Sequence, residues 1–252
     1  MRAPSPIVAA LASLIVCASL AEGQYAHVVT VTVRPGTVSD YADRLLRVRQ
    51  AADRIGDPRT VSVYRSLMGG SPFRFQLVTL FGDYSEMEDW MGGPTAILAQ
   101  AFGEGEAQEM GEMVRDVIES VDISVYTLSP DFTSGLNAPG GGQRYLRVVT
   151  TEVEPGGDAD YAAALRATKA IEDARGIKRN RWTRSEGESF THVVTSVSDT
   201  IVGLAAPGPP GLLAEEYGDE IGGSIWGRAQ AAVRSRTFET WQYDAELSRS
   251  PM

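Results

Sequence analysis

Hydrophobic and polar residues alternate from Tyr25 to Val33, and many of these residues are β-branched, which is typical of a strand. After a turn at Pro35-Gly36, apolar residues recur every three or four positions over 38–55 and predict a helix with one apolar face. Gly56 stands where a left-handed C-terminal cap belongs. At the other end of the helix, Thr37 is predicted to cap the N-terminus.

The pattern then predicts two strands, a second helical region and a last strand. The strands lie near 60–67 and 73–81 and are joined by a turn at Gly69-Gly70, which makes them a hairpin. The second helical region is interrupted at Gly103, and its longer part covers 106–121. A strand over 123–128 follows. The order β-α-β-β-α-β is that of a ferredoxin-like unit.

The same order occurs again in the second half of the chain. Residues 24–56 align with 144–176, and thirteen of the 33 positions are identical, against about two expected by chance. The second half is predicted to contain strands near 145–153, 178–185, 190–197 and 238–243, with helices over 158–175 and 212–236. The fold class is therefore α+β, with an internal repeat of two ferredoxin-like units.

The predicted boundaries are a signal peptide over 1–21, a first unit over 22–132, a linker over 133–143, a second unit over 144–248 and a tail over 249–252. Arg2 precedes an apolar stretch from Ile7 to Leu20, and cleavage is expected after Ala21, with Ala21-Glu22-Gly23 as a second candidate site. This pattern predicts a protein that is exported to the periplasm or secreted; an uncleaved N-terminal anchor is the alternative. The rest of the chain contains no stretch apolar and long enough to span a membrane.

Composition excludes several classes of function. A formal net charge of −10 at pH 7 is unfavourable for nucleic-acid binding, which needs a basic surface. One cysteine and two histidines provide too few ligands for a thiolate zinc site or a histidine-rich metal site. We therefore expect no metal and no nucleic-acid partner.

Two short patterns, Tyr25…Pro35-Gly36…Tyr41…Leu45 and Tyr145…Pro155-Gly156…Tyr161…Leu165, resemble the dimeric α/β-barrel superfamily. That superfamily includes antibiotic-biosynthesis-type monooxygenases, NIPSNAP-like proteins and haem-handling relatives. The resemblance implies two sheets packed face to face in one chain, as a pseudo-dimeric monomer or a homodimer. The matching positions are architectural, so the resemblance implies the fold and not a reaction.

Within that superfamily, the haem proteins carry their proximal histidine on the second helical region of the second half. Residues 204–236 contain no histidine, so no haem and no other cofactor is expected. The cofactor-independent monooxygenases are similar in having pockets of aromatic, amide and arginine side chains. The asparagines of that pattern are not reproduced here.

Four residues of the second half, Trp182, Arg184, His192 and Trp226, are the candidate ligand-binding residues. Three of them stand where the aligned first half has Val63, Gln76 and Gly111, so a cleft for a small organic molecule is predicted in the second half only.

Each candidate also has a structural interpretation. Trp182 can fill core volume, and His192 can be a core histidine. The basic run that includes Lys178, Arg179, Arg181 and Arg184 is interpreted as a charged edge strand. Two functions therefore stay open: a small-molecule-binding protein with cofactor-independent oxidative chemistry, and a non-catalytic structural or interaction protein.

Overall fold

The computed structural model describes residues 24–88, 93–135, 143–186 and 189–249. The predicted signal peptide, the glycine triplet of the linker and the last three residues of the tail lie outside these ranges. The first half contains β1 (Tyr25–Val33), α2 (Val38–Ile55), β2 (Val61–Met68), β3 (Arg74–Phe81), α3 (Tyr84–Glu88), α4 (Gly93–Phe102), α5 (Glu104–Val117) and β4 (Ile118–Leu128). The second half contains β5 (Tyr145–Val153), α6 (Asp158–Arg175), β6 (Asn180–Glu186), β7 (Ser189–Ser198), the 3₁₀ turn η1 (Val202–Ala205), α7 (Pro209–Ala231) and β8 (Val233–Tyr243).

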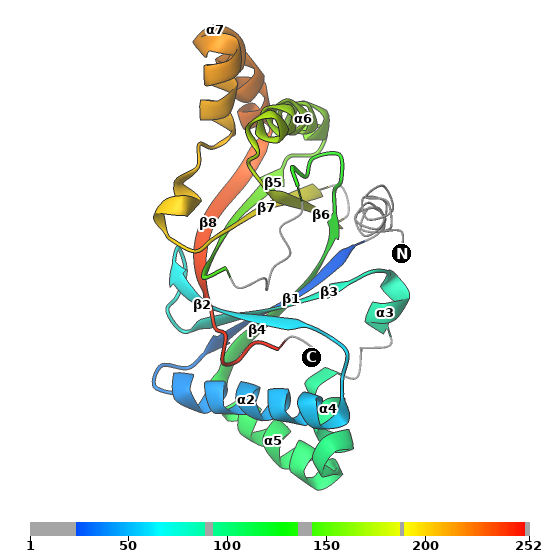
Figure 1. Ribbon diagram of the computed structural model, residues 1–252. Coiled ribbons are helices and arrows are strands. Elements are labelled where there is room, and N and C mark those ends of the chain that lie inside the picture. Colours follow the sequence, from blue (N-terminus) through cyan, green and yellow to red (C-terminus); the bar gives the residue numbers. More distant parts are fainter. Residues whose placement is uncertain (1–23, 89–92, 136–142, 187–188, 250–252) are drawn as a thin grey trace, which may run out of the picture.

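The strands form one closed antiparallel barrel in the order β1-β3-β2-β8-β5-β7-β6-β4 (Figure 1). Each half supplies a four-stranded sheet with its first strand between its third and fourth. The two sheets join where β2 pairs with β8, at Tyr64 and Tyr243, and where β4 pairs with β6, at Leu128 and Trp182. The prediction of two ferredoxin-like units closed as a pseudo-dimeric barrel is confirmed.

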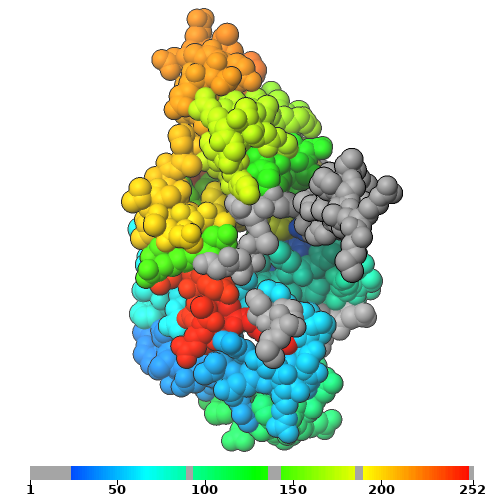
Figure 2. Space-filling model, in the orientation of Figure 1, coloured from blue at the N-terminus to red at the C-terminus, as the bar shows by residue number. Residues whose placement is uncertain are grey.

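Helices cover the outer faces of the two sheets at opposite ends of the molecule, with α2, α4 and α5 at one end and α6 and α7 at the other (Figures 1 and 2). On β1, Val31 and Val33 face outward and pack with Tyr41 of α2. The alternate residue Ala26 faces inward and packs with residues of both sheets. Both faces of the strand are therefore covered, which explains why both are largely apolar in the sequence.

The chain segment that follows the last strand of each half packs on the other half. The Ser129 N–H donates to the Arg181 carbonyl at 2.8 Å, and the Asp244 N–H donates to the Val63 carbonyl at 2.9 Å. A hydroxyl completes each contact: Thr133 Oγ1 accepts the Arg181 N–H at 3.0 Å, and Ser248 Oγ accepts the Val63 N–H at 2.8 Å. We call these two contacts the reciprocal clasp.

Element boundaries differ from the prediction at the ends of the second helical regions. β4 begins at Ile118, five residues before the predicted start at residue 123, and β8 likewise begins at Val233 instead of residue 238. In both cases the last predicted helical turn is instead a strand, because it pairs with β1 or β5. Tertiary pairing overrides a sequence pattern that is compatible with either element.

The predicted N-terminal cap of α2 is wrong. Thr37 Oγ1 makes no hydrogen bond to the first turn of the helix and instead donates to the Arg34 carbonyl at 2.8 Å. The C-terminal cap is confirmed: Gly56 has φ 66°, and its N–H bonds to carbonyls of the last turn. Gly176 ends α6 in the same way, with φ 66°.

Candidate functional site

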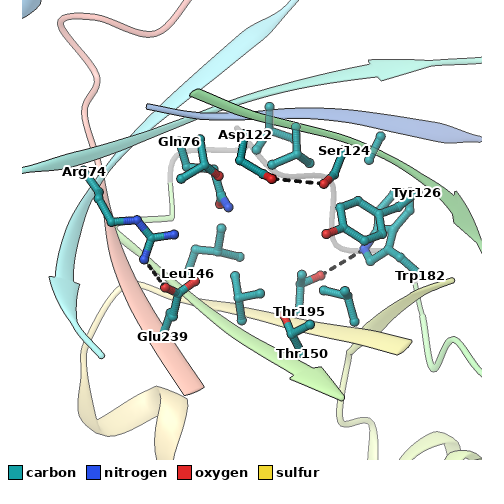
Figure 3. Close-up of a pocket in the computed structure, with 16 residues that line it drawn as sticks. Arg74, Gln76, Asp122, Ser124, Tyr126, Leu146, Thr150, Trp182, Thr195 and Glu239 are labelled. Atoms are coloured by element: carbon teal, nitrogen blue, oxygen red, sulfur yellow. Dashed lines mark hydrogen bonds and ion pairs between the residues drawn. The ribbon is translucent and has the colours of Figure 1, made fainter. Parts of the chain in front are cut away.

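A cavity of about 200 Å³ lies inside the barrel, between the two sheets (Figure 3). Both halves of the chain line it, so it is not confined to the second half as the sequence analysis expected. Its lining residues are Ala26, Val28, Thr30, Arg74, Gln76, Val78, Asp122, Ser124 and Tyr126 from the first half and Leu146, Val148, Thr150, Trp182, Val193, Thr195 and Glu239 from the second.

One side of the cavity carries an ion pair and a free amide. Arg74 of β3 forms an ion pair with Glu239 of β8, and its guanidinium lies 5.1 Å from the centre of the Trp241 ring. Gln76, two residues along the same strand, points its amide into the cavity (Figure 3). Because strand residues alternate between faces, Arg74 and Gln76 must both point inward.

The opposite side of the cavity is aromatic. Trp182 of β6 is almost fully buried, and its Nε1 donates to Thr195 Oγ1 at 3.2 Å. Tyr126 of β4 lies close to it, as Figure 3 shows. The Arg184 guanidinium stacks 5.4 Å from the centre of the Tyr126 ring and donates to Ser124 Oγ. Arg184, which shares a strand face with Trp182, therefore orients two lining residues.

Ser124 continues this hydrogen-bond chain, since its Oγ lies 3.2 Å from Asp122 Oδ1. Asp122 is exposed, so this carboxylate stands at the border between the cavity and solvent. The charged groups that line or directly contact the cavity are thus Arg74, Glu239, Arg184 and Asp122. They comprise two cations and two anions, and each contacts a partner.

The structure does not bring His192 or Trp226 to this cavity. His192 points to the outer face of the second sheet, where its ring centre lies 4.9 Å from that of Tyr161 of α6. Its Nε2 lies 3.0 Å from Asp158 Oδ1. Burial lowers the pKa of His192, and the hydrogen bond and charge of Asp158 offset only part of that effect. Trp226 lies on α7 and packs under the Arg236 guanidinium, 5.0 Å from the ring centre.

The strand register explains why Trp182 lines the cavity and His192 does not. It also corrects the first-half residues that the sequence alignment assigned as counterparts of these two. Trp182 pairs with Val193 of the neighbouring hairpin strand, and the equivalent pair in the first half joins Tyr64 to Gln76. Trp182 therefore corresponds to Tyr64 and not to Val63. Since β1 and β5 are equivalent, the pairs Val31–Phe75 and Thr151–His192 make His192 the counterpart of Phe75.

Phe75 and His192 occupy the same kind of environment. The ring centres of Tyr41 and Phe75 are 4.9 Å apart, as are those of Tyr161 and His192. His192 thus occupies the place of a core phenyl ring, and its side chain packs between the second sheet and α6.

The basic run forms a buried ion cluster, and its interpretation as an edge strand is wrong. β6 pairs with β7 along its length and with β4 at one end. Glu172 of α6 is fully buried and binds Arg179 at 2.6 Å and Arg181 at 2.7 Å. Ser134 Oγ donates to the same carboxylate at 2.6 Å. This cluster ties α6 to β6 and to the segment after β4.

The described residues contain no group of three or more His, Cys, Asp and Glu side chains placed to hold a metal ion. α7 carries no histidine, so it offers no imidazole to a haem iron. In the part of the chain that the structure describes, no helix is both apolar and long enough to cross a membrane.

Comparison with solved structures places this architecture in a known group. A "putative monooxygenase" from Lactobacillus acidophilus NCFM superposes with a TM-score of 0.53 and 10% identity, over 91% of this chain and 97% of that chain. An "anthrone oxidase-like protein" gives a TM-score of 0.54 at 13% identity, over 91% and 94%. The chain has the dimeric α/β-barrel fold.

Another solved structure with the dimeric α/β-barrel fold, a "putative monooxygenase" from Fusobacterium nucleatum, gives a TM-score of 0.52 at 8% identity, over 88% of this chain and 92% of that chain. These matches extend over both halves of the chain. At such identities they show the fold alone. No family model and no curated protein matches the sequence.

Proposed function

We propose that the protein binds a small organic molecule in the central cavity. The observation that carries this proposal is the cavity itself: a closed barrel retains about 200 Å³ of space between its sheets, although interiors are normally filled to crystal density. Its walls combine two aromatic rings and six aliphatic side chains with eight polar or charged ones, and ligand sites likewise combine apolar surface with polar groups that fix orientation.

The charges around the cavity favour an uncharged ligand. Arg74 is already neutralised by Glu239, and Arg184 and Asp122 both bind Ser124. At the Arg74–Glu239 pair, an anionic ligand would have to displace Glu239 from Arg74, and a cationic ligand would have to displace Arg74 from Glu239. Either exchange would cost this half-buried pair without increasing the number of ion pairs.

We include cofactor-independent oxidation of the bound molecule in this proposal. Its support is that fold neighbours are named as monooxygenases and as anthrone oxidase-like. Oxygen uptake by the purified protein in the presence of a bound compound tests this part. Binding without uptake would support the non-catalytic alternative and leave the ligand site intact.

Binding is tested with the variant Trp182→Ala. Loss of the indole removes an aromatic wall of the cavity, and we expect the affinity for a bound aromatic compound to fall about five- to 150-fold, as at interface hot spots. Isothermal titration calorimetry gives the affinity directly.

Trp226→Ala is the matched control, because Trp226 lies on α7, away from the cavity. Its affinity is expected to equal that of the wild type. If Trp226→Ala loses binding while Trp182→Ala keeps it, the ligand lies between the second sheet and α7, and the cavity proposal is wrong.

We also propose export, with cleavage after Ala21. The support is the N-terminal pattern of Arg2 followed by the apolar stretch Ile7 to Leu20. N-terminal sequencing of the protein recovered from the cell envelope or medium is expected to start at Glu22. An intact Met1 on protein from the cytoplasmic fraction would contradict export.

A further inference from the structure

Gln76 is a buried residue of the cavity wall whose side-chain amide has no hydrogen-bond partner among the described residues. Only 8% of its surface is exposed, and Figure 3 shows its amide directed into the cavity. The amide is open to the cavity, so a molecule that fills this space without pairing with it would leave a polar group buried and unsatisfied, which costs about 1–3 kcal/mol in proteins. A bound molecule that pairs with the amide avoids that cost.

The amide is present on one side of the cavity only. The strand register makes Val193 the counterpart of Gln76, because Gln76 pairs with Thr30 and Val193 with the equivalent Thr150. The pseudo-two-fold arrangement therefore provides one amide at this pair of positions and not two. A single molecule per chain, bound in one orientation, is the arrangement that this asymmetry supports.

The aromatic wall on the other side limits the shape of the ligand. Trp182 uses its Nε1 on Thr195 and therefore offers the cavity ring surface and no further donor. Aromatic side chains prefer flat partners that stack or meet them edge to face. An apolar cavity of about 150 Å³ holds benzene, so a cavity of about 200 Å³ suits one ring or a compact pair of rings.

A side-chain amide presents an N–H donor and a C=O acceptor side by side in one plane. A cis amide, in which an N–H adjoins a carbonyl within a ring, satisfies both at once through two parallel hydrogen bonds. A ketone offers only an acceptor. A half rotation of the Gln76 amide exchanges the positions of its donor and acceptor, so the amide can pair with a lactam edge in either orientation.

We infer that the cavity binds an uncharged planar heteroaromatic molecule of one or two rings whose lactam edge pairs with the Gln76 amide. This inference rests on the proposed function and names the ligand class of the same site. Gln76 fixes the orientation of the ligand, and the aromatic wall formed by Trp182 and Tyr126 holds its ring.

The test compares two probes by isothermal titration calorimetry on the full chain. The first is 2-quinolinone, which has two fused rings and a lactam edge. The second is N-methyl-2-quinolinone, which keeps the rings and the carbonyl but lacks the N–H. We expect the wild type to bind 2-quinolinone at least about tenfold more tightly than N-methyl-2-quinolinone, because the methylated probe cannot donate the hydrogen bond to the Gln76 carbonyl.

Gln76→Met removes the amide while keeping the length of the side chain. Its affinity for 2-quinolinone is expected to fall about tenfold or more, and the difference between the two probes should disappear. Gln108→Met on the exposed surface of α5 is the matched control and should behave as the wild type. Circular dichroism and thermal unfolding confirm that both variants are folded.

The outcomes separate this inference from the proposed function. If the wild type binds both probes equally, the lactam inference is overturned while cavity binding stands. That comparison does not depend on the folding of any variant. If neither probe binds and a panel of uncharged one- and two-ring aromatics without a lactam edge also fails to bind, both the inference and the proposed function are overturned.

Discussion

At the scale of single residues, the two halves differ most at positions that the repeat makes equivalent. Phe75 and His192 contact equivalent tyrosines at the same ring separation, but only the histidine can be protonated. Gln76 and Val193 face the cavity from equivalent places, but only the glutamine can form hydrogen bonds. In each case one half carries a polar side chain where the other half has an apolar one at the same register position.

Protonation of His192 is expected to make stability depend on pH. Because burial lowers its pKa below 6.5, the unfolded chain binds a proton at a higher pH than the folded chain does. Stability therefore decreases as pH falls below 6.5 and levels off below the folded-state pKa. His192→Phe, which copies the first half, should reduce this decrease. Urea unfolding at about pH 8 and about pH 5 measures it; an equal decrease in both proteins would contradict the prediction.

At the scale of elements, both halves use a glycine with positive φ to interrupt the second helical region, although the helices themselves differ. Gly103 separates α4 from α5 with φ 97°, and Gly218 breaks α7 with φ 79°. Both positive φ values favour glycine. The second half differs at β6, where Arg179 and Arg181 converge on Glu172. Burial lowers the pKa of Arg179, and the negative charge of Glu172 opposes this effect. The two arginines beside α6 therefore rely on the single carboxylate of Glu172 as their counter-charge.

Glu172→Gln should be among the most destabilising single changes in the second half. The variant leaves two buried guanidinium groups without a counter-charge, which costs about 3–5 kcal/mol. Glu215→Gln is the matched control, because Glu215 pairs with Arg175 at the exposed surface, where such pairs contribute about 0–1 kcal/mol. Urea unfolding gives both values, and similar losses for the two variants would show that the buried cluster is not essential.

At the scale of the whole molecule, the reciprocal clasp makes the two halves interdependent. Each half contributes its last segment to the other, so the edge strand of each sheet, β2 or β6, is hydrogen-bonded to the opposite half. Arg249 extends the second arm of the clasp, with its Nε 2.6 Å from Asp53 Oδ1 and its Nη1 2.8 Å from the Arg59 carbonyl.

The two arms of the clasp should contribute similarly. Thr133→Val and Ser248→Ala each remove the acceptor of a buried N–H, at a cost of about 1–3 kcal/mol. The two arms share no partner, so the double variant should lose the sum of the two within about 0.5 kcal/mol. Thermal and urea unfolding test this. A double variant that unfolds in two separate transitions would show that the halves are independent.

The sequence by itself determined the repeat, the order of elements and the faces of the strands, because alternation, helical periodicity and glycine caps are local features. It also contained a sign of the site: Arg74 and Gln76 are polar residues on the cavity face of an otherwise apolar strand. The sequence alignment paired the strands of the two halves in the wrong register. It therefore pointed to the second half and did not identify Arg74 and Gln76 as candidate site residues.

Only the tertiary structure decided where the space lies. Both faces of a strand such as β1 are covered and largely apolar, so the alternation does not distinguish a filled layer from a hollow one. His192 lies on the filled face and Trp182 on the hollow face, although both belong to the same hairpin. A cavity arises from the combined side-chain volumes of two sheets whose strands are far apart in the chain, and no local pattern records that sum.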